Sequence, residues 1–186
     1  MTAPSDFDSL VREIHPQLVR FLTRMVGAVD AEDVTQTALS KASAAFSSFR
    51  GQASPRTWLF RIAANAARDR LRSHRQLEVV DDEDEAHEPA DSSEDASQER
   101  RLVREEMSKC VDELFARLPE SYQTVLALSD CEELSDSEIA SILDVTEGAA
   151  KIRLHRARSR LKQELSAGCS FYRDDQNVLC CDRKQH

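Results

Sequence analysis

The chain has 186 residues, and its 25 Lys and Arg against 34 Asp and Glu leave a formal net charge of −9 at pH 7. No run of about eighteen apolar residues occurs, and the start MTAPSDFDSL lacks the basic and apolar stretches of a secretory signal. We therefore expect no membrane insertion and a cytoplasmic location. Five cysteines, an odd number, favour reduced thiols over a disulfide framework.

The acidity is concentrated in one segment. Eleven Asp and Glu and no Lys or Arg lie between Glu78 and Glu99, so the rest of the chain carries a net charge of +2. The segment has too few large apolar residues to offset the ordering of its backbone. We predict a flexible acidic linker at 77–100 between domains at 1–76 and 101–166, followed by a tail at 167–186. Neighbouring acids such as Asp81, Asp82 and Asp84 are more typical of a solvated segment than of a metal site.

The first domain is predicted to hold three helices. Apolar residues recur at steps of three and four from Phe7 onward, which predicts a helix that ends near Gly27. Asp30 is the predicted N-cap of the second helix. Ser54 followed by a proline predicts the start of a third helix, which runs to about Arg75.

The outer face of the second predicted helix is acidic and polar. Two interpretations stay open for it, solvent exposure and a surface that docks on another protein. Its residues are Asp30, Glu32, Asp33 and Gln36.

The third predicted helix carries a basic face. Arg61, Asn65, Arg68, Arg72 and Arg75 recur at steps of four, three, four and three, so they share one side of the helix. Such a row favours contact with nucleic-acid phosphates, and the amide of Asn65 can both donate to and accept from a base edge. Trp58 at the head of the helix fits either the core or stacking on an unpaired base.

The second domain contains a predicted helix-turn-helix. Ser135 and Glu138 form a capping box before the first helix, Asp144 suits a left-handed turn, and Thr146 is the predicted N-cap of the second helix. An apolar stripe of Ala150, Leu154, Ala157 and Leu161 faces inward. Six cations occupy its other faces, which favours entry into the DNA major groove. They are Lys151, Arg153, Arg156, Arg158, Arg160 and Lys162.

The tail is rich in cysteine. Cys169, Cys180 and Cys181 lie within thirteen positions, with His186 close behind. Four interpretations stay open: a site for zinc or another thiophilic metal, a redox-active thiol pair, a site for a partner protein, and incidental cysteines at a frayed end. Adjacent cysteines cannot easily both bind one tetrahedral ion. Cys110 is predicted to lie in the core.

Four segments resemble motifs of the extracytoplasmic-function (ECF) sigma factors, small bacterial transcription initiation factors. They are DAEDVTQTAL at 30–39, SPRTWLFRIAANAARDRLR at 54–72, LPESYQTVLAL at 118–128 and EIASILDVTEGAAKIRLHRARSRL at 138–161. The order of the four, with an acidic linker between the second and third, makes the resemblance specific. The turn departs from the family's common glycine at Asp144, and Ile152 replaces a residue that is often polar.

The resemblance implies a role for each surface. The acidic face of the second helix would dock on core RNA polymerase. The third helix would melt and read the minus-ten region through Arg56, Trp58, Arg61, Asn65, Arg68 and Arg72. The helix-turn-helix would read the minus-35 element through Thr146, Lys151, Ile152, Arg153, His155 and Arg156.

The resulting prediction is an all-α protein of two small helical domains, an N-terminal helical bundle and a C-terminal helix-turn-helix domain. We interpret it as an alternative sigma factor of the stress-response type, not an enzyme, that needs no cofactor to bind DNA. Control by an anti-sigma partner or by metal or redox state at the tail stays open. The alternative is a helix-turn-helix regulator that binds operator duplex without polymerase.

Overall fold

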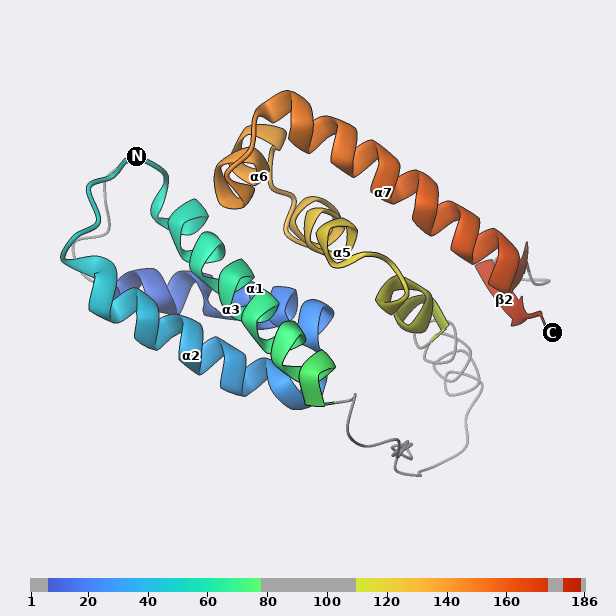
Figure 1. Ribbon diagram of the computed structural model, residues 1–186, viewed down its shortest axis with the longest axis horizontal. Coiled ribbons are helices and arrows are strands. Elements are labelled where there is room, and N and C mark those ends of the chain that lie inside the picture. Colours follow the sequence, from blue (N-terminus) through green and yellow to red (C-terminus); the bar gives the residue numbers. More distant parts are fainter. Residues whose placement is uncertain (1–6, 78–109, 174–178, 185–186) are drawn as a thin grey trace. The chain divides into compact units, whose positions relative to one another are not determined.

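The computed structural model describes residues 7–77, 110–173 and 179–184. Helices dominate these residues, with one short antiparallel pair of strands after the last helix (Figure 1). The described residues fall into two compact units. The first draws on Met1–Asp81 and Glu120–Ala157, and the second on Asp82–Pro119 and Arg158–His186. The predicted linker lies outside the described residues, apart from its first position.

Three helices pack against one another in the first unit: α1 at Phe7–Val26, α2 at Ala28–Phe46 and α3 at Pro55–Leu77. Their apolar faces meet in a core where the rings of Phe21 and Phe60 lie 5.5 Å apart, edge to face. Edge-to-face geometry places the positive rim of one ring against the negative face of the other. Phe60, near the start of α3, is fully buried.

The junction of α1 and α2 corrects one prediction. Gly27 has a φ of 83°, and α2 begins directly after it at Ala28. The left-handed conformation is open to glycine at little cost, so the chain turns within one residue. Asp30 is therefore not the N-cap. It lies in the first turn of α2, where its carboxylate accepts a hydrogen bond from Arg70 Nη2 at 2.7 Å.

The start of α3 confirms the prediction. The Ser54 hydroxyl accepts a hydrogen bond from the backbone N–H of Thr57 at 3.0 Å, and Pro55 is the first helical residue. A side-chain acceptor satisfies an N–H that has no partner inside the helix. The helix then continues to Leu77, two residues past the predicted end.

The helix-turn-helix follows α5 at Glu120–Leu126 and a π-helical turn, η1, at Ala127–Cys131. The first helix of the motif, α6 at Asp136–Leu143, has the predicted capping box between Ser135 and Glu138. Asp144 adopts the left-handed conformation, with φ 55° and ψ 50°. The second helix, α7 at Glu147–Gly168, begins where the Thr146 hydroxyl accepts from the backbone N–H of Ala149.

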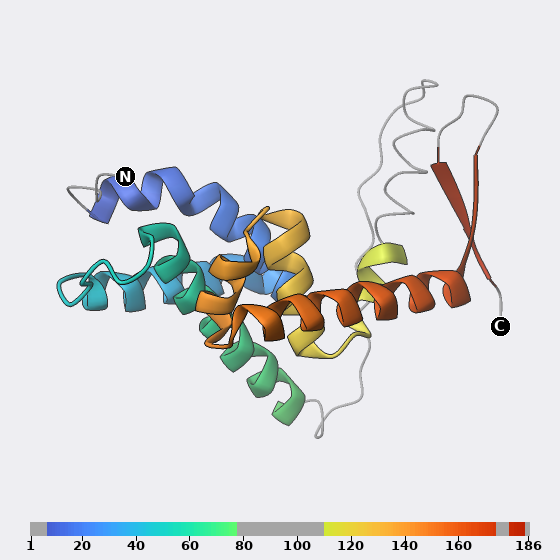
Figure 2. The same cartoon turned by 90° about the horizontal axis from the view of Figure 1, so that it is seen from above.

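The second unit contains the end of α7, a helical segment at 110–116, and a hairpin of β1 at Cys169–Arg173 with β2 at Leu179–Arg183. Cys169 pairs with Arg183, and Phe171 pairs with Cys181. Figure 2 shows the two strands side by side beyond the last turn of α7. The all-α prediction holds for the bulk of the fold and missed this hairpin. None of the described helices is long and apolar enough to cross a membrane.

Candidate nucleic-acid interface

The basic row of α3 is present but unevenly accessible. Asn65 and Arg72 are exposed, whereas Arg61 and Arg68 are half-buried. Lys41 on α2 contacts Asp69, which follows Arg68 in the sequence, at 3.4 Å. The middle of α3 therefore presents an amide that can read a base, flanked by guanidinium groups that can bind phosphates.

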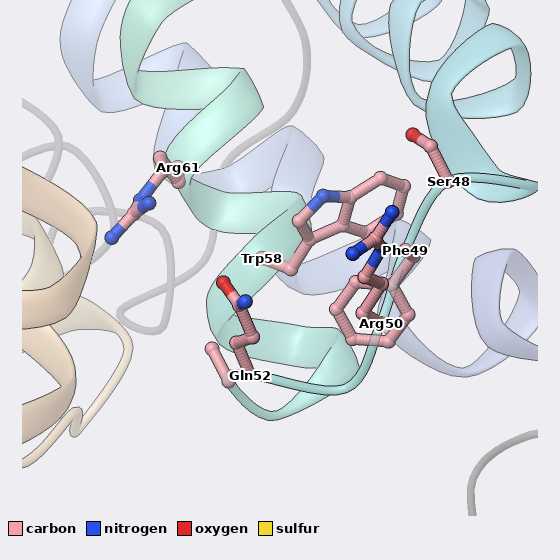
Figure 3. Close-up of a pocket in the computed structure, with 7 residues that line it drawn as sticks. Ser48, Phe49, Arg50, Gln52, Trp58 and Arg61 are labelled. Atoms are coloured by element: carbon pink, nitrogen blue, oxygen red, sulfur yellow. The ribbon is translucent and has the colours of Figure 1, made fainter.

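An aromatic cluster stands at the head of α3. The half-buried Trp58 ring lies 4.9 Å from Phe49 and 6.1 Å from Phe46. A pocket of about 170 Å³ opens beside it, lined by Ser48, Phe49, Arg50, Gln52, Ala53, Trp58 and Arg61. Figure 3 shows the Arg50 and Gln52 side chains next to the two rings, and the Arg61 guanidinium directed away from the indole. A flat aromatic wall with nearby cations and an amide suits an unpaired base.

The sequence analysis assigned a DNA contact only to Trp58 and Arg61 among these lining residues. Phe49 and Gln52 lie in the connection between α2 and α3, where no helical periodicity marks a functional face. Only the composition of this connection could have indicated a site. An aromatic residue, an arginine and a glutamine crowd into four positions before a helix that carries a basic row.

Arg56 and Arg61 make contacts within the first unit. Arg56 donates to the backbone carbonyl of Glu132 at 2.8 Å, and its guanidinium lies 5.6 Å from the centre of the Phe60 ring. Arg61 donates to the backbone carbonyl of Ser141 in α6. Two of the six predicted minus-ten residues are therefore held by protein acceptors in this structure.

Glu132 is the centre of this set of contacts. Its carboxylate is fully buried and accepts from Nε and Nη2 of Arg20 at 3.1 and 3.0 Å, with Arg56 Nη2 at 4.0 Å. Burial raises the pKa of Glu132, while the hydrogen bond and charge of Arg20 oppose the rise. Nothing in the sequence pattern marked Glu132, because its partner Arg20 is 112 positions away.

The exposed side of α7 carries most of the predicted minus-35 residues. Thr146, Lys151, Ile152, His155 and Arg156 are exposed, and Arg153 is half-buried. Lys151 donates to Glu147 one turn earlier at 2.7 Å, which raises the pKa of the lysine. Ile152 exposes 55% of its surface, an unusual fraction for a large apolar side chain. An apolar residue among cations can contact a thymine methyl in the major groove.

The acidic face of α2 divides into two parts. Glu32, Asp33 and Gln36 are exposed, whereas Asp30 is half-buried and bound to Arg70. The hydrogen bond from Arg70 lowers the pKa of Asp30. Glu32, Asp33 and Gln36 remain open to a partner, while Asp30 already contributes to the packing of α2 on α3.

The structure regroups the tail cysteines. Cys169 and Cys181 lie together with Cys110, which was predicted to be core. Cys180 is buried and is not part of this group of three, and His186 lies outside the described residues. The hydrogen bond with Cys169, together with burial, raises the pKa of the Cys110 thiol.

Comparison with family models gives two matches in chain order. Sigma-70 region 2 matches residues 10–76, and Sigma-70, region 4 matches residues 108–161. The RNA polymerase sigma-H factor of Pseudomonas aeruginosa is 33% identical over 165 residues, covering 86% of each chain. The ECF sigma factor SigW of Bacillus subtilis is 32% identical and covers 86% of this chain and 88% of its own. The chain belongs to the ECF sigma factors of the sigma-70 family.

Solved structures agree with this family. CnrH in complex with the cytosolic domain of CnrY superposes with a TM-score of 0.63 at 25% identity, covering 87% of this chain and 88% of that one. The sigma factor RpoE of Bartonella quintana, in complex with the anti-sigma factor NepR, gives a TM-score of 0.66 at 24% identity, covering 88% and 98%. This sigma factor directs promoter recognition and transcription initiation, and both α1–α3 and α6–α7 lie largely within the residues that match region 2 and region 4, respectively.

Proposed function

We propose that this sigma factor captures an unpaired promoter base of the minus-ten region in the pocket beside Trp58. The supporting observation is the juxtaposition of the Trp58 and Phe49 rings with Arg50 and Gln52 at the head of a basic helix. Base stacking on an aromatic ring contributes about 1–3 kcal/mol per base and is independent of sequence. Gln52 and Asn65 then supply hydrogen bonds that distinguish bases.

Region 4 binds the minus-35 element as duplex. The exposed side of α7 enters the major groove, with Lys151 and Arg156 on phosphates or base edges and Ile152 on a thymine methyl. Thr146 at the N-terminus of α7 lies where backbone N–H groups favour a phosphate.

Core RNA polymerase docks on the exposed part of the acidic α2 face, Glu32, Asp33 and Gln36. The chain itself supplies positioning, phosphate neutralisation and base capture, and the polymerase supplies catalysis in the cytoplasm. A protein of the anti-sigma class is the expected regulator, because RpoE of Bartonella quintana was solved in complex with the anti-sigma factor NepR.

Transcription in vitro tests the proposal directly. Purified core polymerase is supplied with a promoter library, with and without this protein, and initiated transcripts are sequenced. We expect a narrow set of promoters to fire only with the protein present. No added initiation would contradict the proposal, and specific binding to duplex without polymerase would support the alternative regulator.

Two substitutions on α3 refine the test. Asn65→Ala removes an exposed amide, and Ser73→Ala removes an exposed hydroxyl two turns further along the same helix. Loss of a base contact costs about 1–3 kcal/mol, so Asn65→Ala should reduce open-complex formation roughly tenfold and relax the preference at one minus-ten base. Ser73→Ala should behave as wild type.

A further inference from the structure

Three sulfur atoms meet in the second unit. The Sγ atoms of Cys110, Cys169 and Cys181 all lie within 4.8 Å of one another, and the Cys110 and Cys169 sulfurs are 3.0 Å apart. Cys110 is the first described residue of the helical segment at 110–116, Cys169 begins β1, and Cys181 is the third residue of β2. Residues far apart in the sequence are therefore brought to one point by the fold.

The strand register explains which cysteines take part. Cys169 pairs with Arg183, and Cys181 pairs with Phe171, two residues along each strand. Residues two apart on a strand, and residues paired across strands, share one face of a hairpin. Cys169 and Cys181 therefore project from the same face, while Cys180, paired with Tyr172, projects from the other.

The surrounding contacts hold the three elements together. Arg183 in β2 pairs with Glu113 of the helical segment at 2.5 Å. The backbone N–H of Lys184 donates to the carbonyl of Gly168 at 2.9 Å, which ties the end of β2 to the end of α7. Leu114 packs so closely on Gly168 that a Cβ there would lie 3.2 Å from it. The cysteines are thus placed by a framework that does not depend on bonds between their sulfurs.

The sulfur spacing fits coordination of one ion by all three. Two thiolates bound to the same tetrahedral zinc at about 2.3 Å lie about 3.8 Å apart, so small side-chain rotations bring the three sulfurs to that spacing. A disulfide joins only two sulfurs and leaves the position of the third unexplained. Three converging thiols of this kind are typical of sites for thiophilic metals.

We propose that Cys110, Cys169 and Cys181 bind one thiophilic metal ion, with Zn²⁺ as the ion to test. Each thiol loses its proton to solvent as it coordinates, and the fourth position is left to water or a further ligand. The bound ion links the 110–116 helix to the hairpin. This site is separate from the DNA-binding surfaces and does not depend on the proposed function.

The test uses the full-length protein, purified under reducing conditions and stripped of metal. Zinc content after addition of ZnCl₂ and gel filtration is measured by mass spectrometry, and affinity is measured by competition with a chromophoric chelator. Co²⁺ provides a second reading, because thiolate coordination gives an intense charge-transfer absorption. We expect one zinc per chain and a cobalt spectrum typical of several thiolates.

Four serine variants locate the site. Cys110→Ser, Cys169→Ser and Cys181→Ser should each weaken zinc binding at least about tenfold, since even loss of an outer-shell partner typically costs 10–100-fold. Cys180→Ser is the matched control on the opposite face and should keep the wild-type stoichiometry and cobalt spectrum. Circular dichroism identifies any variant that has lost its fold, and cobalt titration of the remaining variants then decides the result.

Three results would overturn the proposal. One is equal zinc content in wild type and the three variants. Another is a cobalt spectrum without thiolate absorption. The third is a Cys110–Cys169 disulfide, mapped by peptide mass spectrometry, in a protein that takes up no zinc after reduction.

Discussion

The two basic helices, α3 and α7, differ in the groups that their cationic side chains contact. On α3, Arg56, Arg61 and Arg70 bind acceptors on other elements, including backbone carbonyls of residues 132 and 141. On α7, Lys151 and Arg160 pair with acids one turn away on the same helix. Exposed i,i+4 pairs contribute only about 0.3–0.5 kcal/mol. In the proposed function, DNA therefore replaces the local pairs of α7 at small cost, whereas Arg56 and Arg61 of α3 first release their protein acceptors.

Aromatic residues of α3 divide in a similar way between the core, where Phe60 lies, and the proposed base-binding pocket beside Trp58. The substitution Phe60→Ala tests this division and has the largest expected effect. Phe60 is fully buried against Phe21, so its truncation leaves a cavity and should lower the free energy of unfolding by about 3–5 kcal/mol. Urea denaturation measures the loss. The half-buried Trp58 is the control. Trp58→Ala should lower the free energy of unfolding less than Phe60→Ala does, and should reduce open-complex formation more. Equal losses of stability in the two variants would contradict the division between core and pocket.

The contribution of the buried Glu132 carboxylate, which binds Arg20 and lies 4.0 Å from Arg56, is tested by Glu132→Ala. The substitution removes a buried carboxylate that Arg20 and Arg56 share, but the Arg20 side chain is 59% exposed and can be rehydrated. We therefore expect a loss of about 1–3 kcal/mol, below that of a fully buried pair. Chemical denaturation gives this value. Glu133→Gln, at the exposed neighbouring position, should be neutral, and a neutral Glu132→Ala would show that the buried carboxylate contributes nothing.

On α7 the comparison predicts changes in DNA binding without changes in stability. Lys151→Ala should weaken promoter binding uniformly across sequences and reduce the salt slope by about one, as expected for a phosphate contact. Ile152→Ala should instead change the preferred minus-35 sequence, with a cost of about 1 kcal/mol. Transcription from a randomised minus-35 library at two salt concentrations distinguishes the effect of Lys151→Ala from that of Ile152→Ala. Identical promoter preferences in both variants would remove the proposed role of Ile152.

The smallest effect is expected at the Asp30–Arg70 pair, which joins α2 to α3. Arg70 lowers the pKa of Asp30, so the pair stabilises the fold above the unfolded pKa of Asp, about 3.8, and the contribution is lost as pH falls through the lower folded value. Asp30→Asn should therefore cost about 0.2–1 kcal/mol at pH 7 and nothing at the lowest pH. Thermal unfolding between pH 2 and pH 7 measures it, with the exposed Glu32→Gln as control.

The sequence predicted features that depend on neighbouring residues. Ser54, Ser135 and Thr146 cap helices because each hydroxyl reaches a backbone N–H three residues ahead. Asp144 takes the left-handed turn because the conformation is a property of that one residue. Such local rules need no knowledge of the rest of the fold.

Long-range partners account for the errors and omissions. Asp30 looked like a cap, but Gly27 starts the helix earlier and Arg70, forty positions away, binds the carboxylate. Cys110 was predicted to be core because nothing close to it in the sequence indicates its partners. Cys169 and Cys181 are brought to it by a hairpin whose strands have only five residues each, too short to be marked by the sequence pattern. The domain limits and the individual DNA contacts stay predictions.

The π-helical turn at Ala127–Cys131 has a consequence for how this chain tolerates change. A π turn holds one residue more than an α turn, and each residue of a helix adds about 100° of rotation. The extra residue is accommodated within this one turn, so deleting one residue here should restore a regular helix and leave Glu132 close to Arg20 and Arg56. A one-residue insertion would instead add about 100° of rotation and carry Glu132 away from Arg20, so the contacts of this segment should tolerate a deletion in the turn better than an insertion.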